Sequence, residues 1–185
     1  QRGDADDKRF FGQHDVQWIE KGLPDEGKIM IFNNGQGRDD GNYSSVDIID
    51  PPIENDGNYA IESGIAYGPQ DLFWTYVSNP VEDFFSSRLS GAQRLPNGNT
   101  LICSGRFGHF FEISPEGTIV WDYINPVGNF GPTTQGNNPN SNDVFRALRY
   151  GAEYKAFEDK DLIPEDPIEI DPLMSECEII EEPLT

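Results

Sequence analysis

Residues 90–105 read SGAQRLPNGNTLICSG and carry the strongest signal for the fold. Its Pro-Asn-Gly-Asn turn suits a tight β-hairpin, because Asn97 and Gly98 both tolerate a positive φ. We expect four short strands here and just beyond, at residues 92–95, 100–103, 109–113 and 118–123. Four antiparallel strands within about forty residues have the size and layout of one β-propeller blade.

A second copy of this pattern lies upstream. The stretch 74–80, WTYVSNP, matches the stretch 121–126, WDYINP, apart from one extra residue. Residues 14–35 parallel residues 92–105 as a strand, a turn, a strand and a glycine. The upstream copy is longer, because residues 43–50 form its third strand and a loop follows. The pattern therefore predicts two blades.

Two blades do not make a closed propeller. Propellers close with about four to eight blades, because each blade buries its faces only against its neighbours. We therefore expect an all-β chain that is the C-terminal portion of a larger propeller, completed by an N-terminal part or by other subunits. The expected organisation is a lead-in at 1–12, propeller blades over 13–150 (at 13–80 and 90–126, with a closing strand at 143–150), and an irregular acidic tail at 151–185.

The charge of the chain excludes some functions. The formal net charge is −20, from 33 acidic and 13 basic residues, which argues against nucleic-acid binding. Residues 158–185 hold eleven acidic residues and one lysine, which is typical of a solvated tail. No apolar run approaches the length of a transmembrane helix. The acidity suits a cation-rich location, and we expect a secreted, periplasmic or cell-surface protein.

The two cysteines, Cys103 and Cys177, allow a single disulfide. Such a bridge would tie the acidic tail to the last blade, with about 2–4 kcal/mol of stabilisation. Two unrelated thiols are an equally good interpretation. The cysteine spacing does not fit a zinc site.

Several of these motifs resemble the arylsulfotransferase-like (aryl-sulfate sulfotransferase) family. In that family a His-Asp segment precedes a strand that ends in Asn-Gly with an arginine nearby, and a Leu-Pro-Asn-Gly-Asn-Thr-Leu blade follows. The matching segments here are Gln13-His14-Asp15, Phe32-Asn33-Asn34-Gly35 with Arg38, 95–101, 120–123 and 143–150. The resemblance covers roughly residues 10–165.

The resemblance implies transfer of a sulfuryl group from a phenolic sulfate ester to another phenol, without a nucleotide donor and without a cofactor. A histidine nucleophile would carry the group between two half-reactions. His14 then acts as the nucleophile or as a supporting histidine, and Arg38 binds the sulfuryl oxygens. A local ion pair with neighbouring aspartates is the alternative for Arg38.

Further residues are candidates for binding. Asp15 can orient the imidazole of His14 or satisfy loop amides, and Asn34 belongs to the matched motif. Arg94 and Arg106 flank the hairpin and can point into a channel. His109 is expected to be an ordinary strand histidine, and the family pattern of several site histidines is not met, since the chain has only two.

Two further possibilities complete the expectations. Asp39 and Asp40 offer oxygens to Ca²⁺, although a solvated acidic loop is the default interpretation. The alternative to an enzyme is a non-catalytic propeller that serves as a binding or assembly module at a surface. The shortage of histidines and the two-blade count favour this alternative.

Overall fold

The computed structural model describes residues 3–173, and this part of the chain is all-β. It contains β-strands and three short 3-10 helices but no α-helix. The strands of the two larger sheets are β1 (His14–Trp18), β2 (Ile29–Asn33), β3 (Ser45–Ile49), β4 (Trp74–Tyr76), β5 (Gly91–Arg94), β6 (Thr100–Ser104), β7 (His109–Ile113) and β8 (Ile119–Ile124). The all-β prediction is confirmed.

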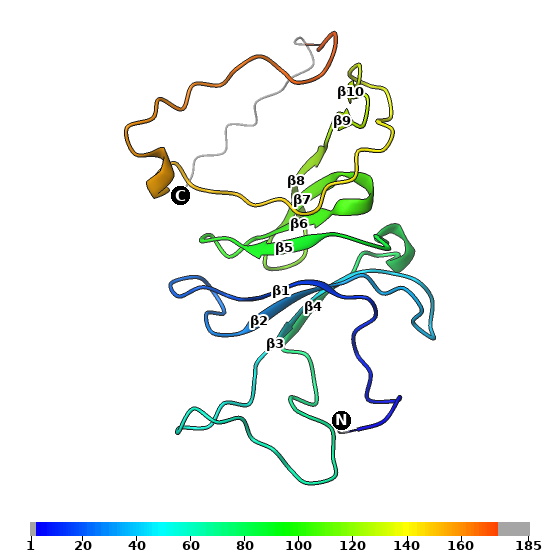
Figure 1. Cartoon of the computed structure of the whole chain (residues 1–185), viewed down its shortest axis with the longest axis vertical. Coiled ribbons are helices and arrows are strands. Elements are labelled where there is room, and N and C mark those ends of the chain that lie inside the picture. The colour runs from blue at the N-terminus through cyan, green and yellow to red at the C-terminus, as the bar shows by residue number, and fades with distance from the viewer. Residues whose placement is uncertain (1–2, 174–185) are drawn as a thin grey trace.

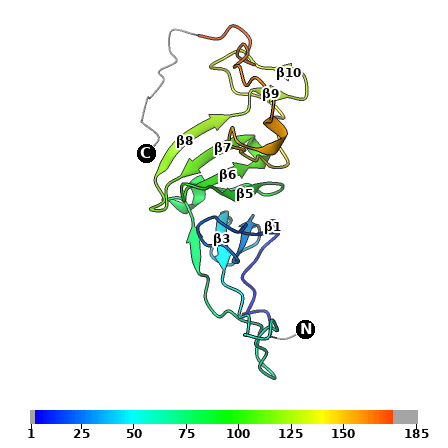
Figure 2. The same ribbon diagram turned by 90° about the vertical axis from the view of Figure 1, so that its left-hand side faces the viewer.

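Each of these sheets has four antiparallel strands in the order of the sequence. Sheet 1 is β1-β2-β3-β4 and sheet 2 is β5-β6-β7-β8. The two sheets lie one above the other, with the N-terminal segment beside sheet 1 and the C-terminal segment beside sheet 2 (Figures 1 and 2). Such up-and-down sheets are the layout expected for two blades. Closure into a propeller stays a prediction.

The hairpin that decided the fold forms within one residue of the expected positions. Arg94 pairs with Thr100 across β5 and β6, and the Gly98 amide donates to the Leu95 carbonyl over 3.0 Å. Gly98 has φ +90°, whereas Asn97 keeps a negative φ. A single left-handed residue therefore makes this turn.

The hydrophobic core lies between the two sheets. Alternate residues of the strands point to it, as the two-residue period of a β-strand requires. Phe84, in the connection between β4 and β5, packs edge-to-face on Phe32 of sheet 1 at 5.7 Å and on Phe111 of sheet 2 at 5.4 Å. The other buried members of this core are Ile19, Met30, Val46, Ile48, Tyr76, Ala92, Ile102 and Ile113.

The two Trp-x-Tyr triplets occupy equivalent places in their sheets. Tyr76 pairs with Val46 on the face of sheet 1 that meets sheet 2, and it is buried there. Trp121 pairs with Glu112 on the opposite face of sheet 2, which points away from sheet 1. The two triplets therefore lie on corresponding faces of their sheets, and Trp121 remains 39 % exposed.

Residues 143–150 were expected to add a closing strand, and this expectation is wrong. The segment has no strand assignment and crosses sheet 2 as an extended chain (Figure 1). Backbone bonds tie it to sheet 2 only at Val144 and Phe145, while Arg149 is held by the side chain of Gln93 in two hydrogen bonds. The amide and carbonyl of Arg149 thus bond to a side chain instead of to a neighbouring strand.

The rest of the described chain is irregular. It includes the two-residue strands β9 (Val127–Gly128) and β10 (Gly131–Pro132), and the 3-10 turns Val81–Asp83, Gly105–Phe107 and Lys155–Phe157. From residue 151 to 173 the tail has no strand, and an isolated bridge joins Ile170 to Thr134. Within residues 3–173 no helix has the length and apolar character needed to cross a bilayer.

Candidate functional site

His14 opens β1, on an edge of sheet 1, where it pairs with Phe32 of β2. The register of this pair shifts between His14 and Gln17, which is a β-bulge. Asp15 has φ +50° inside the bulge. A bulge re-aims the side chains around it, and bulges are common beside functional sites.

The imidazole of His14 is held through one of its two ring nitrogens. Its Nδ1 atom lies 2.7 Å from Oδ1 of Asn34 and 3.0 Å from the Gly12 carbonyl oxygen. Asn34 is fully buried, and its Nδ2 donates to the carbonyls of Ser86 and Leu89 over 2.6 and 3.1 Å. These two carbonyls determine which end of the Asn34 amide is oxygen.

The partners of His14 decide its tautomer. Both groups near Nδ1 are acceptors, so in the neutral ring Nδ1 carries the proton. Nε2 then keeps its lone pair, and His14 is half-buried rather than enclosed. Nε2 is therefore the ring nitrogen with the chemistry of a nucleophile or a base.

Asp15 does not orient His14, although it is the next residue. Its Oδ2 accepts from the Ala92 amide at 3.2 Å and from Nε2 of Gln17 at 3.1 Å. Gln17 in turn donates to the Ala92 carbonyl over 2.6 Å. The positive φ turns this carboxylate towards sheet 2, so Asp15 joins the two sheets and Asn34 takes the orienting role.

Arg146 was not expected at this site. Its Nη1 lies 3.3 Å from Oδ1 of Asp15, and half of its side chain is exposed. Arg146 and Asp15 are 131 residues apart in the sequence, so no local pattern indicated their contact. It places a guanidinium beside the residue that follows His14.

Arg38 is held on the other side of the Asn34-Gly35 turn. Its Nε donates to the Tyr43 carbonyl over 3.2 Å, its Nη2 donates to Oγ of Ser45 over 2.8 Å, and it lies over the Tyr43 ring. Gly35 has φ +76°, and a Cβ there would collide with the Tyr43 carbonyl and crowd Nε of Arg38. Among residues 3–173 Arg38 has no ion-pair partner, so the local ion pair does not form.

The surroundings of Arg38 differ from those of His14. Ser45 donates to the buried Asp47, which also accepts from Asn33 and Thr75. These side chains lie on the face of sheet 1 that points away from sheet 2, whereas Asn34 bonds to the connection between the sheets. Arg38 and His14 therefore share one turn and approach it from different sides.

The other two arginines have structural partners. Arg94 is buried; its Nη2 pairs with Asp25 at 2.9 Å, and its Nη1 donates to Thr100 and the Gly98 carbonyl. Burial lowers the pKa of its guanidinium, and Asp25 opposes that shift. Arg106 pairs with Asp143 at 3.4 Å, and Asp143 also pairs with Arg88. The hydrogen bond from Arg88 contributes most to holding the pKa of Asp143 below its usual value, and the charges of both arginines add to it.

The remaining candidate residues lie outside the surroundings of His14. His109 bonds through Nε2 to Asp122 at 2.8 Å, on β7 and β8. Burial raises the pKa of Tyr43, and the hydrogen bond that its hydroxyl donates to Asp40 raises it further. Across the described part of the chain, no group of three or more His, Cys, Asp or Glu side chains is placed to hold a metal ion, so Asp39 and Asp40 do not gather a calcium site of that kind.

Cys103 is buried in β6, and its expected disulfide partner, Cys177, lies outside the described residues. Desolvation raises the pKa of the Cys103 thiol to about 12. The disulfide stays a prediction.

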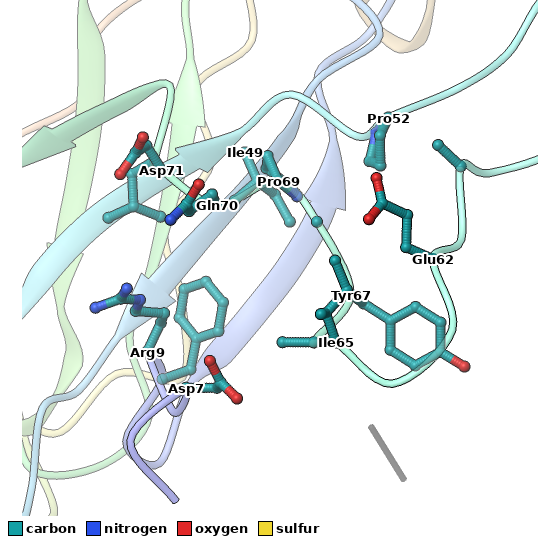
Figure 3. A pocket seen from close by; sticks show the side chains of 15 residues that line it. Asp7, Arg9, Ile49, Pro52, Glu62, Ile65, Tyr67, Pro69, Gln70 and Asp71 are labelled. Atoms are coloured by element: carbon teal, nitrogen blue, oxygen red, sulfur yellow. The ribbon is translucent and has the colours of Figure 1, made fainter. Parts of the chain in front are cut away.

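Two cavities are compared with the position of His14. One, of about 590 Å³, lies between the N-terminal segment at Asp7 and Arg9 and the loop that carries Glu62 and Tyr67 (Figure 3), and His14 does not line it. The other, of about 360 Å³, lies between β1, β5 and the C-terminal segment. Gln17 and Arg146, both partners of Asp15, line it, together with Trp18, Tyr150 and Tyr154. This second cavity is the one adjacent to the His14 strand.

Comparison with known proteins identifies one family. The family model described as arylsulfotransferase (ASST) matches residues 3–146, which is most of the chain. No curated protein and no solved structure matches the chain significantly.

Proposed function

Because the chain belongs to the arylsulfotransferase (ASST) family, we propose that it transfers a sulfuryl group between phenolic compounds through Nε2 of His14. The observation that supports this proposal best is the contact between Nδ1 of His14 and Asn34, because it leaves Nε2 unprotonated and free. A positioned neutral imidazole is a competent nucleophile near neutral pH.

The proposed reaction has two half-reactions. Nε2 attacks the sulfur of an aryl sulfate, the bond between sulfur and the aryl oxygen breaks, and the phenolate leaves and takes a proton from water. The oxygen of a second phenol then attacks the sulfur, the bond between sulfur and Nε2 breaks, and the phenolic proton goes to water. Covalent transfer of this kind divides one difficult step into two easier ones.

We propose that the 360 Å³ cavity beside β1 receives the aryl ring. Trp18, Tyr150 and Tyr154 offer aromatic surface there, and Arg146 offers a cation for the sulfuryl oxygens. Arg38 is the second proposed ligand of these oxygens, since its guanidinium is not neutralised by a carboxylate. Of the two, Arg146 lies closer to the His14 strand through Asp15.

Transfer from 4-nitrophenyl sulfate to phenol tests this proposal, with release of 4-nitrophenol followed by absorbance. We expect His14→Gln to abolish transfer, and Arg146→Ala and Arg38→Ala to lower it about 10-fold or more through loss of a charge-assisted contact. Gln13→Ala is the matched control, because Gln13 is exposed beside His14. Full activity of His14→Gln, or no transfer by the unmodified chain, would overturn the proposal.

We further propose that additional blades, from the same protein or from other subunits, pack against both outer faces of the pair of sheets. Val16 of sheet 1 is 58 % exposed, and Trp121 of sheet 2 faces outward in the place that Trp74 takes between the sheets. Large exposed apolar surface of this kind favours burial against a partner. A secreted, periplasmic or surface location is part of this proposal and rests on the acidic composition.

The second candidate function is a non-catalytic binding or assembly module. It is favoured by β8, an edge strand on which Ile119, Val120 and Ile124 are all at least 44 % exposed. Unpaired apolar edges promote association between chains. Sedimentation equilibrium, combined with the transfer assay, tests this second function. A binding or assembly module should self-associate stably or capture further blades, and it should show no transfer activity. A monomer with transfer activity would exclude this function.

A further inference from the structure

A third cavity, of about 570 Å³, opens between the sheets at the side of β4 and β8. Its walls come from the end of β4, the connection that follows it, and strands β6, β7 and β8. No residue of β1 or β5 lines it, so it is separate from His14 and from the cavity beside β1. Its volume is within the range of small-molecule sites, which is about 300–1,000 Å³.

Aromatic rings form much of this wall. Tyr76 and Phe111 lie at its base, with ring centroids 6.1 Å apart, and Phe84 packs against both. Phe107 lies at the cavity with 53 % of its surface exposed. Rings at such distances offer offset and edge-to-face contacts to another flat ring.

One polar group in the wall is oriented in a specific way. The His109 ring packs on Phe111 at 5.0 Å, and its Nε2 lies 2.8 Å from Oδ2 of Asp122. In the neutral ring the carboxylate holds the proton on Nε2, so Nδ1 becomes a hydrogen-bond acceptor. The cavity thus combines an aromatic wall with a single imidazole acceptor.

The charge of the wall selects among aromatic compounds. Asp83 lines the cavity, while neither lysine nor arginine belongs to the lining residues that the structure describes. Burial of an anionic group without a cation is unfavourable. An aryl sulfate or an aryl carboxylate is therefore disfavoured here, and a neutral ring is favoured.

We propose that this cavity binds a neutral aromatic molecule that carries a hydroxyl or ring N–H group, with that group donating to Nδ1 of His109. Phenols and indoles share this chemistry. The proposal is independent of sulfuryl transfer at His14, since no residue of that site takes part.

Titration of the full chain with 4-fluorophenol and with 5-fluoroindole, followed by fluorine NMR and by amide shifts of the protein, tests the proposal. We expect saturable binding of one or both probes, with the largest amide shifts at residues 104–111 and 119–124. 4-Fluorophenyl sulfate should not shift these amides. Binding of the phenol alone or of the indole alone identifies the source, and either result supports the site.

Two variants distinguish the contribution of the aromatic wall to binding from that of the hydrogen-bond acceptor. His109→Phe keeps a ring and removes the acceptor, and we expect about five- to tenfold weaker binding from the loss of one hydrogen bond. Phe107→Ala should also weaken binding, whereas Phe130→Ala, at a residue that is 98 % exposed and outside the cavity, should not. Absence of saturable shifts, equal binding of the sulfate ester, or undiminished binding by His109→Phe would overturn the proposal.

Discussion

Nδ1 of His14 and Oδ1 of Asn34 lie 2.7 Å apart, across the start of β1 and the residue that follows β2. The contact joins residues twenty positions apart, and the buried amide of Asn34 is itself fastened to two carbonyls. The histidine is thereby held in one orientation by a neutral hydrogen-bond partner rather than by a carboxylate. This relationship carries most of the functional proposal.

The tautomers of the two histidines give a direct test of this contact. We expect neutral His14 to carry its proton on Nδ1 and neutral His109 to carry it on Nε2, because their partners bind opposite nitrogens. Long-range nitrogen–proton NMR spectra distinguish the two forms, and His109 serves as the internal control. Asn34→Ala should raise the share of the Nε2–H form of His14, because the Gly12 carbonyl is then the one remaining acceptor at Nδ1. It should also lower the free energy of unfolding by about 2–4 kcal/mol by leaving buried carbonyls unpaired. Matching tautomers in the unmodified chain would contradict the assignment.

The role of Asp15 in joining the two sheets can also be tested, because its carboxylate fills the space where a side chain at Gly91 would lie. A Cβ at Gly91 would collide with this carboxylate, and the φ of Gly91 is not in the left-handed region. We expect Gly91→Ala to cost about 1–3 kcal/mol by overpacking. In an Asp15→Gly background, which suits the positive φ of residue 15, the same change should cost clearly less. Equal costs in both backgrounds, measured by urea unfolding, would show that Asp15 does not join the sheets in this way.

Arg94 is predicted to stabilise the fold rather than to bind a ligand through its guanidinium. Its side chain is 4 % exposed and contacts Asp25, Thr100 and the Gly98 carbonyl. Arg94→Lys should lower the free energy of unfolding by about 2–4 kcal/mol, since an ammonium group cannot make the same set of contacts. Arg88→Lys is the control, because its ion pair with Asp143 is largely exposed and should contribute less than about 1 kcal/mol. Similar losses in both variants would contradict the buried role of Arg94.

The buried thiol of Cys103 makes the free energy of unfolding depend on pH in the alkaline range. Burial raises the pKa of its thiol from 9.0 to about 12, so above pH 9 the unfolded chain loses this proton while the folded chain keeps it. The unfolded state then binds fewer protons, and stability falls as the pH rises from about 9 towards 12. Urea unfolding between pH 8 and pH 10 should show this loss in a Cys177→Ser chain and a smaller loss once Cys103→Ala is added. In the Cys177→Ser chain, rapid alkylation of folded Cys103 at pH 8 would contradict its burial.

Much of the fold was predictable from the sequence, because turns and strands leave local signals. The Asn97-Gly98 turn and the Trp-x-Tyr triplets located both four-stranded sheets to within a residue or two. The segment 143–150 was predicted wrongly as a strand. Its actual bonding, through Arg146 and Arg149 to distant side chains, leaves no local signal.

The candidate site was less predictable than the fold. His14 and Arg38 were found from a motif, but the sequence left open whether Asp15 orients the imidazole of His14 or satisfies loop amides. The bulge in β1 and the φ of Asp15 turn its carboxylate away from His14, and neither feature can be read from residue types. Arg146 lies beside Asp15 only because the C-terminal segment returns across sheet 2.

The measurement that tests the central claim most directly is identification of the sulfurylated residue. The chain is incubated with 4-nitrophenyl sulfate in the absence of a phenol acceptor, quenched in alkali, digested and analysed by mass spectrometry. We predict one added SO₃ group on His14, its loss on addition of phenol, and its absence in His14→Gln. Adduct on another residue, or transfer to phenol without any adduct on His14, would contradict the account.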